Sequence, residues 1–457
     1  MGIPCYFSYI LRKYPYIITP LHGKFDNLYM DSNSIIYDMA STMDASCTTF
    51  ETTLIDLVCK RIDYYLSLIQ PKRVIIAFDG VPPMAKIKQQ RERRYKSWIM
   101  PTDKKWNTLQ ITPGTAFMNQ LDVSLRDYFK TYPQKYSYFK LSTSVEDGEG
   151  EHKIFSFIRE HPDFHHSQNT LVYGLDSDLI ILSLNHLKYG NIKLLREAPA
   201  FMLDDKELHL LDVTKLADGI VKLIGDKITD YIFMTLLLGN DFMPHFPALN
   251  LRTNGFDTLL QTYKECIKPE ERLVDEGIHW DVFERFVLAL SKKEEIIMIK
   301  EYLYRNKMKV DVSTEEKKKN NLPMLHREIE HYICPIKKGW ESRYYSVLLK
   351  EDISKICKNY IQMIQWNMNY YTTGCTDWSI KYNYMYPPLL IDLAKQIVPV
   401  EPTVNHTKMA STELLHYVLP PPFHHYIPEQ ESSNAPYPKL VWAYCRYSWE
   451  SHVQFNE

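Results

Sequence analysis

The chain has 457 residues, of which 45% are hydrophobic and 24% are charged, a composition that is typical of a folded globular protein and argues against a disordered one. The formal net charge is −2, from 54 basic and 56 acidic residues, so the total alone does not indicate a nucleic-acid-binding protein. The eight cysteines include no C-x-x-C pair, which argues against a zinc site or a disulfide framework. No apolar run approaches the length of a membrane span, and we therefore expect no membrane association.

Short apolar strands and amphipathic helices alternate through the first 240 residues. Segment 73–79 is almost continuously apolar, as expected for a strand that is buried on both faces of a parallel sheet. This alternation predicts an α/β fold with a mainly parallel central sheet flanked by helices. Strands are expected at 27–31, 73–79, 136–141 and the start of 170–178, and helices at 50–69, 114–129, 149–159 and 228–238.

Beyond about residue 256 the pattern changes to helical segments rich in lysine and glutamate. The polar stretch 313–321 is typical of a flexible connector, and the chain after residue 337 is dense in tyrosine and tryptophan. We expect three regions: the α/β core at 1–255, a helical extension with the connector at 256–336, and a mostly helical, aromatic-rich region at 337–457 that packs on the core.

Seven acidic residues stand where the expected strands or helices begin or end. They are Asp31, Asp79, Glu149, Glu151, Asp176, Asp178 and Asp241. The four aspartates from 31 to 178 follow strands, whose carboxyl ends share one edge of a parallel sheet, so their side chains converge in one crevice. The two glutamates alternate with glycines at a helix entry, where the backbone can approach closely, and the last aspartate follows a Gly-Asn turn.

Bringing these carboxylates together requires cations. An uncompensated buried charge costs several kcal/mol, and divalent ions remove that cost. Carboxylate oxygens without histidine or cysteine favour Mg²⁺ or Mn²⁺ over zinc. A single acid at a strand end is common on any protein surface. The prediction of a metal site therefore depends on the three different settings of these acids, at strand ends, at a helix entry and after a Gly-Asn turn, which all suit one site. Two ions would support phosphodiester hydrolysis, which indicates a metal-dependent nuclease or phosphatase.

A basic helix is expected directly after Asp79, because Pro82 and Pro83 precede a polar, positively charged run and proline is favoured in a first helical turn. Helical spacing places four of its polar residues on one face; these are Lys86, Gln90, Arg93 and Arg94. Guanidinium groups and an ammonium on one stripe suit a terminal phosphate. A solvated basic helix is the alternative, and the position beside a proposed metal ligand favours phosphate binding.

With these residues in view, the chain resembles the XRN family of 5′→3′ exoribonucleases over nearly its full length. The segments that carry the resemblance to the first conserved region are 1–7, 31–37, 79–94, 111–115, 148–153, 173–179, 194–197 and 239–245, and those similar to the second conserved region are 339–345, 364–366, 374–378 and 418–421.

The resemblance implies a PIN/5′-nuclease-like core and a processive, metal-dependent enzyme that degrades RNA carrying a 5′-monophosphate and releases 5′-mononucleotides. It implies that the seven acids form the catalytic metal site, with two Mg²⁺ or Mn²⁺ ions, and that the four residues of the basic helix bind the 5′-phosphate. Pro83 would lie where the incoming strand is kept single, and the third region would brace the active site. The chain is expected to be a compact member without the long C-terminal extensions of larger relatives.

Two departures from the family pattern concern base stacking. The family has glycine and histidine where this chain has Ser34 and Tyr37, and Tyr37 keeps an aromatic face but no imidazole. Its expected partner in the stack is Trp378, while the family's second tryptophan is replaced by Ile380. A tyrosine or tryptophan that merely packs in the core is the alternative for each position.

Two other functions remain as alternatives. One is a flap-type, structure-specific 5′ DNA nuclease. Such nucleases also use a cluster of carboxylates, but their last acid is followed by a glycine-rich helical hairpin, and residues 242–250 of this chain lack those glycines. The other is a catalytically silent RNA-binding scaffold. The preferred interpretation predicts a cytoplasmic monomer that binds single-stranded RNA, with a nuclear location as the alternative and protein partners unspecified.

Overall fold

The structure of the chain is a computed structural model, which describes residues 2–44, 49–101, 106–197 and 208–455. Within the described residues the main sheet has seven strands in the order β1-β7-β6-β5-β2-β3-β4. Their bounds are β1 Ile18–Pro20, β2 Asn27–Asp31, β3 Arg73–Ala77, β4 Tyr138–Ser142, β5 Asn169–Tyr173, β6 Asn191–Glu197 and β7 Leu208–Asp212. Strands β6, β5, β2, β3 and β4 are parallel, and β7 and β1 add an antiparallel edge.

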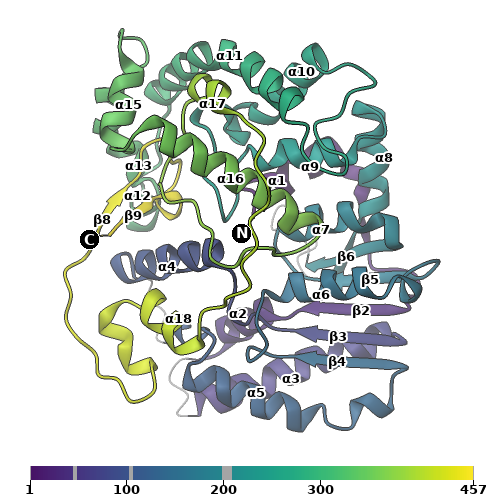
Figure 1. Cartoon of the computed structure of the whole chain (residues 1–457). Coiled ribbons are helices and arrows are strands. Elements are labelled where there is room, and N and C mark those ends of the chain that lie inside the picture. Colours follow the sequence, from purple (N-terminus) through teal and green to yellow (C-terminus); the bar gives the residue numbers. More distant parts are fainter. Residues whose placement is uncertain (1, 45–48, 102–105, 198–207, 456–457) are drawn as a thin grey trace.

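Helices cover both faces of this sheet (Figure 1). Successive side chains of a strand point to opposite faces: Tyr29 of β2 packs with the helices that follow β4 and β5, whereas Leu28 and Met30 pack with those that follow β2 and β3. The helices of this part are α1 Tyr6–Lys13, α2 Asn33–Thr42, α3 Phe50–Ile69, α4 Met84–Ile99, α5 Ala116–Tyr128, α6 Gly150–Glu160, α7 Asp178–His186, α8 Val213–Ile224 and α9 Ile228–Leu236. The expected α/β fold is confirmed.

The rest of the chain is mostly helical and packs on α7 and α9, with which it shares one hydrophobic core. Its elements are α10 Gly255–Cys266, α11 Trp280–Lys307, α12 Glu315–Asn320, α13 Leu322–Leu325, α14 Glu328–Ile333, α15 Trp340–Leu348, α16 Ile353–Thr372, α17 Leu390–Gln396 and α18 Ser411–Val418, followed by the small hairpin of β8 Lys439–Val441 and β9 His452–Gln454. None of the helices in the described ranges has both the length and the apolar character needed to cross a lipid bilayer.

The segment 313–321, expected as a flexible connector, contains helix α12 instead. The side chain of Thr314 accepts a hydrogen bond from the backbone N–H of Lys317, 3.1 Å away, and so caps the first turn. Glutamates occupy this first turn and lysines the last one, an arrangement that stabilises a helix through its dipole. The charged composition therefore reflects an exposed helix rather than a connector without structure.

Helices α11 and α17 are joined by a buried carboxylate. Glu294 of α11 is 3% exposed and accepts hydrogen bonds from the backbone N–H groups of Leu390 at 2.8 Å and Ile391 at 3.3 Å. Burial raises the pKa of Glu294 to about 7, although these two hydrogen bonds oppose the shift. The folded chain therefore holds a proton here at pH values where the unfolded chain has released it.

This carboxyl group predicts how stability changes with pH. Between the ordinary pKa of 4.5 and the raised value of about 7, the folded state binds more protons, so its contribution makes the free energy of unfolding fall as pH rises through this window. In the Glu294→Gln variant we expect the decrease in the free energy of unfolding across this window to be smaller by roughly 3 kcal/mol. The measurement is urea unfolding at pH 5 and pH 7.5. Glu295→Gln, on the exposed side of the same helix, is the control, and an equal pH dependence in both variants would contradict the assignment.

Candidate active site

Four of the expected site residues follow strands β2, β3 and β5. Asp31 is the last residue of β2, and it pairs in register with Ala77, the last residue of β3. Asp79 follows β3 by two residues, and Asp176 and Asp178 lie after β5, where Asp178 begins α7. Because β3, β2 and β5 are adjacent parallel strands, these aspartates share one edge of the sheet, as expected.

The Gly-Glu-Gly-Glu segment brings α6 against this edge. Glu149 precedes the first turn, and the backbone N–H of Gly150 donates a hydrogen bond of 2.7 Å to Oδ1 of Asp79. A Cβ atom at Gly150 would lie 2.5 Å from Oδ1 of Asp31, so only glycine allows this approach. Asn33 fixes the other carboxylate oxygen of Asp79 by donating a hydrogen bond of 2.7 Å.

Lys86 of α4 connects the remaining acids. Its Nζ lies 2.5 Å from Oε1 of Glu149 and 2.9 Å from Oδ2 of Asp241. Burial would lower the pKa of Lys86, but the negative charges of Asp241 and Glu149 outweigh it and raise the pKa well above the usual value. Likewise, burial would raise the pKa of Asp241, yet the Lys86 ammonium keeps it well below its usual range. Lys86, expected to bind phosphate, is thus already engaged by carboxylates.

Other acids of the cluster repel one another. Burial, together with Asp79 and Asp176, raises the pKa of Asp31 well above its usual range. Burial and the neighbouring Asp178 and Glu149 do the same for Glu151. Burial and Asp241 raise the pKa of Asp178 to about 7. Each named neighbour is another of the seven acids, which shows that these side chains lie close enough to interact.

Three carboxylate oxygens in this cluster are buried without a hydrogen-bond partner among the described residues. They are Oδ1 of Asp31, Oε2 of Glu151 and Oδ1 of Asp178. Leaving a buried acceptor unpaired is costly, more so for a charged group. Oxygen atoms placed in this way are the donors that hard divalent cations such as Mg²⁺ take, so the residues present fit such an ion.

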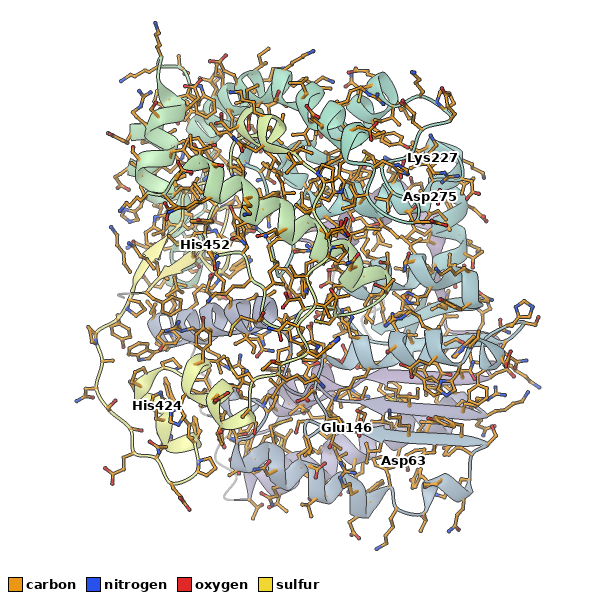
Figure 2. All side chains as sticks on the ribbon, in the orientation of Figure 1. Asp63, Glu146, Lys227, Asp275, His424 and His452 are labelled. Carbon is orange, nitrogen blue, oxygen red and sulfur yellow. The ribbon has the colours of Figure 1, made fainter. Side chains whose placement is uncertain are left out.

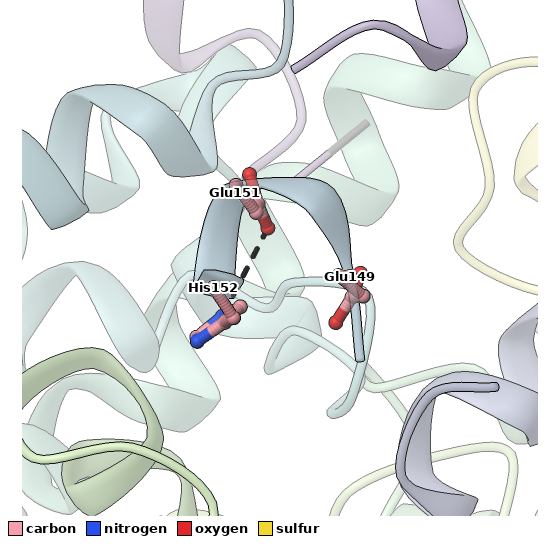
Figure 3. Close-up of side chains that lie close together, drawn as sticks. All are labelled: Glu149, Glu151 and His152. Atoms are coloured by element: carbon pink, nitrogen blue, oxygen red, sulfur yellow. Dashed lines mark ion pairs between the residues drawn. The ribbon is translucent and has the colours of Figure 1, made fainter. Parts of the chain in front are cut away.

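His152 is a neighbour of these acids that the sequence analysis did not select. Potential ligand atoms of Glu149, Glu151 and His152 lie within 4.8 Å of one another (Figure 3), and Nε2 of His152 is 4.0 Å from Oε1 of Glu151. Burial lowers the pKa of His152 well below its usual value, so the ring is neutral at pH 7. In the sequence, the position of His152 directly after the Glu-Gly-Glu segment could have indicated that it lies near the acids.

The aromatic-rich region reaches the acids through helix α16. The hydroxyl of Tyr370 donates a hydrogen bond of 2.5 Å to Oε2 of Glu149, and the Tyr370 ring packs on His152, with ring centroids 3.6 Å apart. Asn367, one turn earlier, accepts a hydrogen bond of 3.2 Å from Asn240, the residue before Asp241. Tyr370 was not selected from the sequence, because the chain contains many tyrosines and nothing in their local sequence distinguishes this one.

The four polar residues of α4 differ in exposure. Lys86, Gln90 and Arg94 are buried, whereas Arg93 is exposed. The Arg94 guanidinium donates to Oγ1 of Thr112 from Nε at 3.0 Å and from Nη2 at 2.8 Å. Although Arg93 is exposed as a residue, its guanidinium is surrounded by protein groups, and the loss of water there would lower its pKa. Tyr37 and Asp241 outweigh this effect and raise the pKa, which places the guanidinium near both.

The two residues expected to stack on a base, Tyr37 and Trp378, lie in different surroundings. Tyr37 is a half-buried residue of α2 that packs against the core. The carbonyl of Trp378 accepts a hydrogen bond of 2.9 Å from the N–H of Met84, which follows the buried Pro83. Among the described rings, no direct contact joins Tyr37 and Trp378, and their stacking on RNA stays a prediction.

Comparisons with known proteins agree with the motifs. Residues 1–101 and 98–198 match the family model described as "XRN 5'-3' exonuclease N-terminus", and residues 224–334 and 307–430 match that described as "Xrn1 helical domain". The chain is 25% identical over 574 aligned positions to 5'-3' exoribonuclease 1 of Saccharomyces cerevisiae, covering 86% of this chain and 37% of that protein. It is 27% identical over 497 positions to 5'-3' exoribonuclease 1 of Homo sapiens, covering 86% and 29%.

The chain thus spans 37% and 29% of the length of these two curated relatives. Among solved structures, the catalytic core of Rad2 in complex with DNA substrate is similar with a TM-score of 0.37 and 13% identity, covering 68% of this chain and 81% of that one. The two family models together match most of the sequence, and the chain therefore belongs to the XRN family of 5′–3′ exonucleases.

Proposed function

We propose that this chain is a metal-dependent 5′→3′ exoribonuclease that degrades RNA with a 5′-monophosphate processively and releases 5′-mononucleotides. The observation that carries the proposal is the cluster of buried carboxylates, three of whose oxygens lack partners among the described residues, near the cationic side chain of Arg93. The names of the relatives, 5'-3' exoribonuclease 1 of yeast and human, support RNA as the substrate class.

The seven acids would hold two divalent ions, Mg²⁺ or Mn²⁺. They are Asp31, Asp79, Glu149, Glu151, Asp176, Asp178 and Asp241. When bound, such ions activate a water molecule and stabilise the leaving oxygen in phosphodiester hydrolysis. The nearby imidazole of His152 offers a nitrogen atom within 4.8 Å of ligand atoms of Glu149 and Glu151.

The other residues would position these carboxylates and the RNA end. Asn33 and the Gly150 amide hold Asp79, and Tyr370 holds Glu149. Lys86 neutralises two of the acids, which keeps the carboxylates together before a cation arrives.

On the RNA side, Arg93 would bind the 5′-phosphate directly. Arg94, which Thr112 holds in place, would complete a positively charged wall behind it, together with Gln90 and Lys86. Such a pocket would accept a monophosphate and leave no room for a cap, and Tyr37, Pro83 and Trp378 would border the entering strand.

The first test varies only the 5′ end of the RNA. We expect rapid release of mononucleotides from 5′-monophosphorylated RNA in Mg²⁺, and little release from 5′-triphosphate or 5′-hydroxyl RNA or after chelation of the metal. The measurement is a time course analysed for mononucleotides, with a 5′ flap DNA of equal length in parallel. Intact monophosphorylated RNA, or faster cleavage of the flap DNA, would refute the proposal.

The second prediction concerns the acids. Asp176→Asn with Asp178→Asn should lower the turnover rate by roughly a thousandfold or more, because removing groups that act together abolishes most transition-state stabilisation. The same variant should lose the increase in melting temperature that Mg²⁺ or Mn²⁺ gives the wild-type chain, since a ligand stabilises the state that binds it.

Asp226→Asn, an exposed acid at the start of the loop before α9, is the matched control for this pair and should behave like the wild-type chain. A double variant that keeps its turnover would favour the silent scaffold instead.

The third prediction concerns Arg93. Because Arg93 is an exposed residue whose side chain makes no hydrogen bond to any described side chain, Arg93→Ala should fold normally. A charge-assisted contact contributes about 1.5–3 kcal/mol, so we expect kcat/KM for monophosphorylated RNA to fall about 10- to 100-fold with little change for 5′-hydroxyl RNA. Lys60→Ala, an exposed cation on α3, is the control; an equal loss on both RNAs would count against phosphate binding by Arg93.

A further inference from the structure

Arg196 is a buried arginine at the edge of the sheet that carries the acids. It belongs to β6, and the residue before it, Leu195, pairs in register with Tyr173 at the end of the parallel strand β5. Arg196 therefore stands beside the point at which the chain leaves β5. Glu146, which follows β4 and is labelled in Figure 2, lies at the same edge of the sheet. Segment 194–197 carries part of the resemblance to the family, and neither the metal ligands nor the phosphate pocket includes it.

Two contacts hold the Arg196 side chain inside the protein, where the residue is 6% exposed. Its Nη2 donates a hydrogen bond to the backbone carbonyl of Leu175. Its guanidinium lies over the ring of Phe7 in α1, 4.0 Å from the ring centroid, which is a favourable position for a cation. Burial lowers the pKa of Arg196 to about 10, and the negative charge of Asp176 opposes this shift. The side chain is therefore a cation at pH 7 and lies near Asp176.

Leu175 belongs to the loop that carries two of the seven acids. Residues 174–177 connect β5 to α7 without strand or helix structure, and this loop contains Asp176 and leads directly to Asp178. The hydrogen bond from Arg196 to Leu175 is charge-assisted, and such bonds are roughly twice as strong as those between neutral groups. Arg196 therefore anchors the loop at the residue before Asp176.

The chain before α1 confines the same loop from another direction. A Cβ atom at Gly2 would overlap Oδ1 of Asp178, so the backbone of this segment lies directly against that carboxylate. With Arg196 at Leu175 and Gly2 at Asp178, the loop is held on both sides of Asp176.

A buried cation at this position is unfavourable by itself. Nη1 of Arg196 has no hydrogen-bond partner among the described residues, so folding leaves part of the guanidinium uncompensated, which costs free energy. An apolar side chain of similar length would avoid this cost. The position near Asp176 gives a reason for the charge, because a cation there reduces the repulsion between the carboxylates. Lys86 has the same effect on Glu149 and Asp241.

We propose that Arg196 is a positioning residue of the metal site, an inference that rests on the proposed function. Through the carbonyl of Leu175 it fixes the loop 174–177, and with it the carboxylates of Asp176 and Asp178. Arg196 itself touches neither the cation nor the RNA. Its loss should therefore weaken metal binding and leave recognition of the RNA 5′ end unchanged.

The test compares Arg196→Met and Arg196→Lys with the wild-type chain. Methionine removes the charge and the hydrogen bond but keeps much of the apolar length. We expect the Kd for Mn²⁺, measured by calorimetry, to rise roughly tenfold, because the loss of a group that orients metal ligands typically weakens binding by this much or more. Turnover at limiting Mn²⁺ should fall and recover at high Mn²⁺, while KM for monophosphorylated RNA stays unchanged. Lysine keeps a cation and a donor but not the planar guanidinium, so its Kd should lie between the other two.

Arg73→Met is the matched control, since this arginine makes the same kinds of contact at the opposite end of the sheet. Arg73 begins β3, donates a hydrogen bond of 3.2 Å from Nη1 to Oδ1 of Asn27, and lies over the ring of Phe164, 4.7 Å from its centroid. Both methionine variants should lower the melting temperature measured without metal. Only Arg196→Met should change the Kd for Mn²⁺.

Weaker Mn²⁺ binding in Arg196→Met, with Arg196→Lys in between and Arg73→Met unchanged, supports the positioning role. A lower melting temperature with the wild-type Kd and turnover would show that Arg196 is merely structural and would overturn the proposal, as would a raised KM with an unchanged Kd. Should Arg196→Met not fold, the lysine variant decides, and a Kd equal to the wild-type value overturns the proposal.

The proposed function fails separately from this inference. A wild-type chain that binds no Mn²⁺ overturns both ideas. A wild-type chain that binds Mn²⁺, with the expected differences between the variants, but leaves monophosphorylated RNA intact overturns the proposed function and still supports the role of Arg196.

Discussion

Mutual repulsion between buried carboxylates is the constraint on which the active-site region depends. Among the described residues, the ammonium of Lys86 compensates two of the acids directly, while burial and neighbouring negative charges raise the pKa values of Asp31, Glu151 and Asp178. A group of like charges is unfavourable wherever it is buried, so the fold must hold it in place with the rest of its packing energy. The large shared core beneath α7, α9 and α16 provides that energy.

The two parts that the family models match meet at this point. The N-terminal part supplies the sheet edge and Glu149, and α16 of the helical part supplies Tyr370, which contacts Glu149. Within the helical part, Asn367 of α16 contacts Asn240, the residue before Asp241. The acids are therefore positioned jointly by segments more than two hundred residues apart in the chain. The site therefore consists of the carboxylates together with the α16 side chains that hold them.

Sequence patterns were enough for the features that depend on local periodicity. The strand at 27–31, the helix at 50–69 and the acids at strand ends follow from apolar spacing and from the geometry of parallel sheets. Contacts between distant segments could not be predicted: nothing local distinguishes Tyr370 from other tyrosines, and periodicity placed Lys86 beside Arg94 without showing that carboxylates bind one and Thr112 the other. The edge strands β1 and β7 were missed, because β1 has only three residues and β7 pairs antiparallel with its neighbours, outside the parallel pattern followed in the sequence. The proposed boundaries at 255 and 336 stay predictions.

Helix α4 is tied to its surroundings on three sides. Arg94 is bonded to Thr112, Lys88 to the carbonyls of Tyr382 and Tyr384, and Lys96 to the carbonyls of Trp449 and Ser451. Long basic side chains ordinarily lose much rotational entropy when they order around a ligand. For these three side chains that loss is incurred during folding, so this part of α4 presents a rigid, preorganised surface.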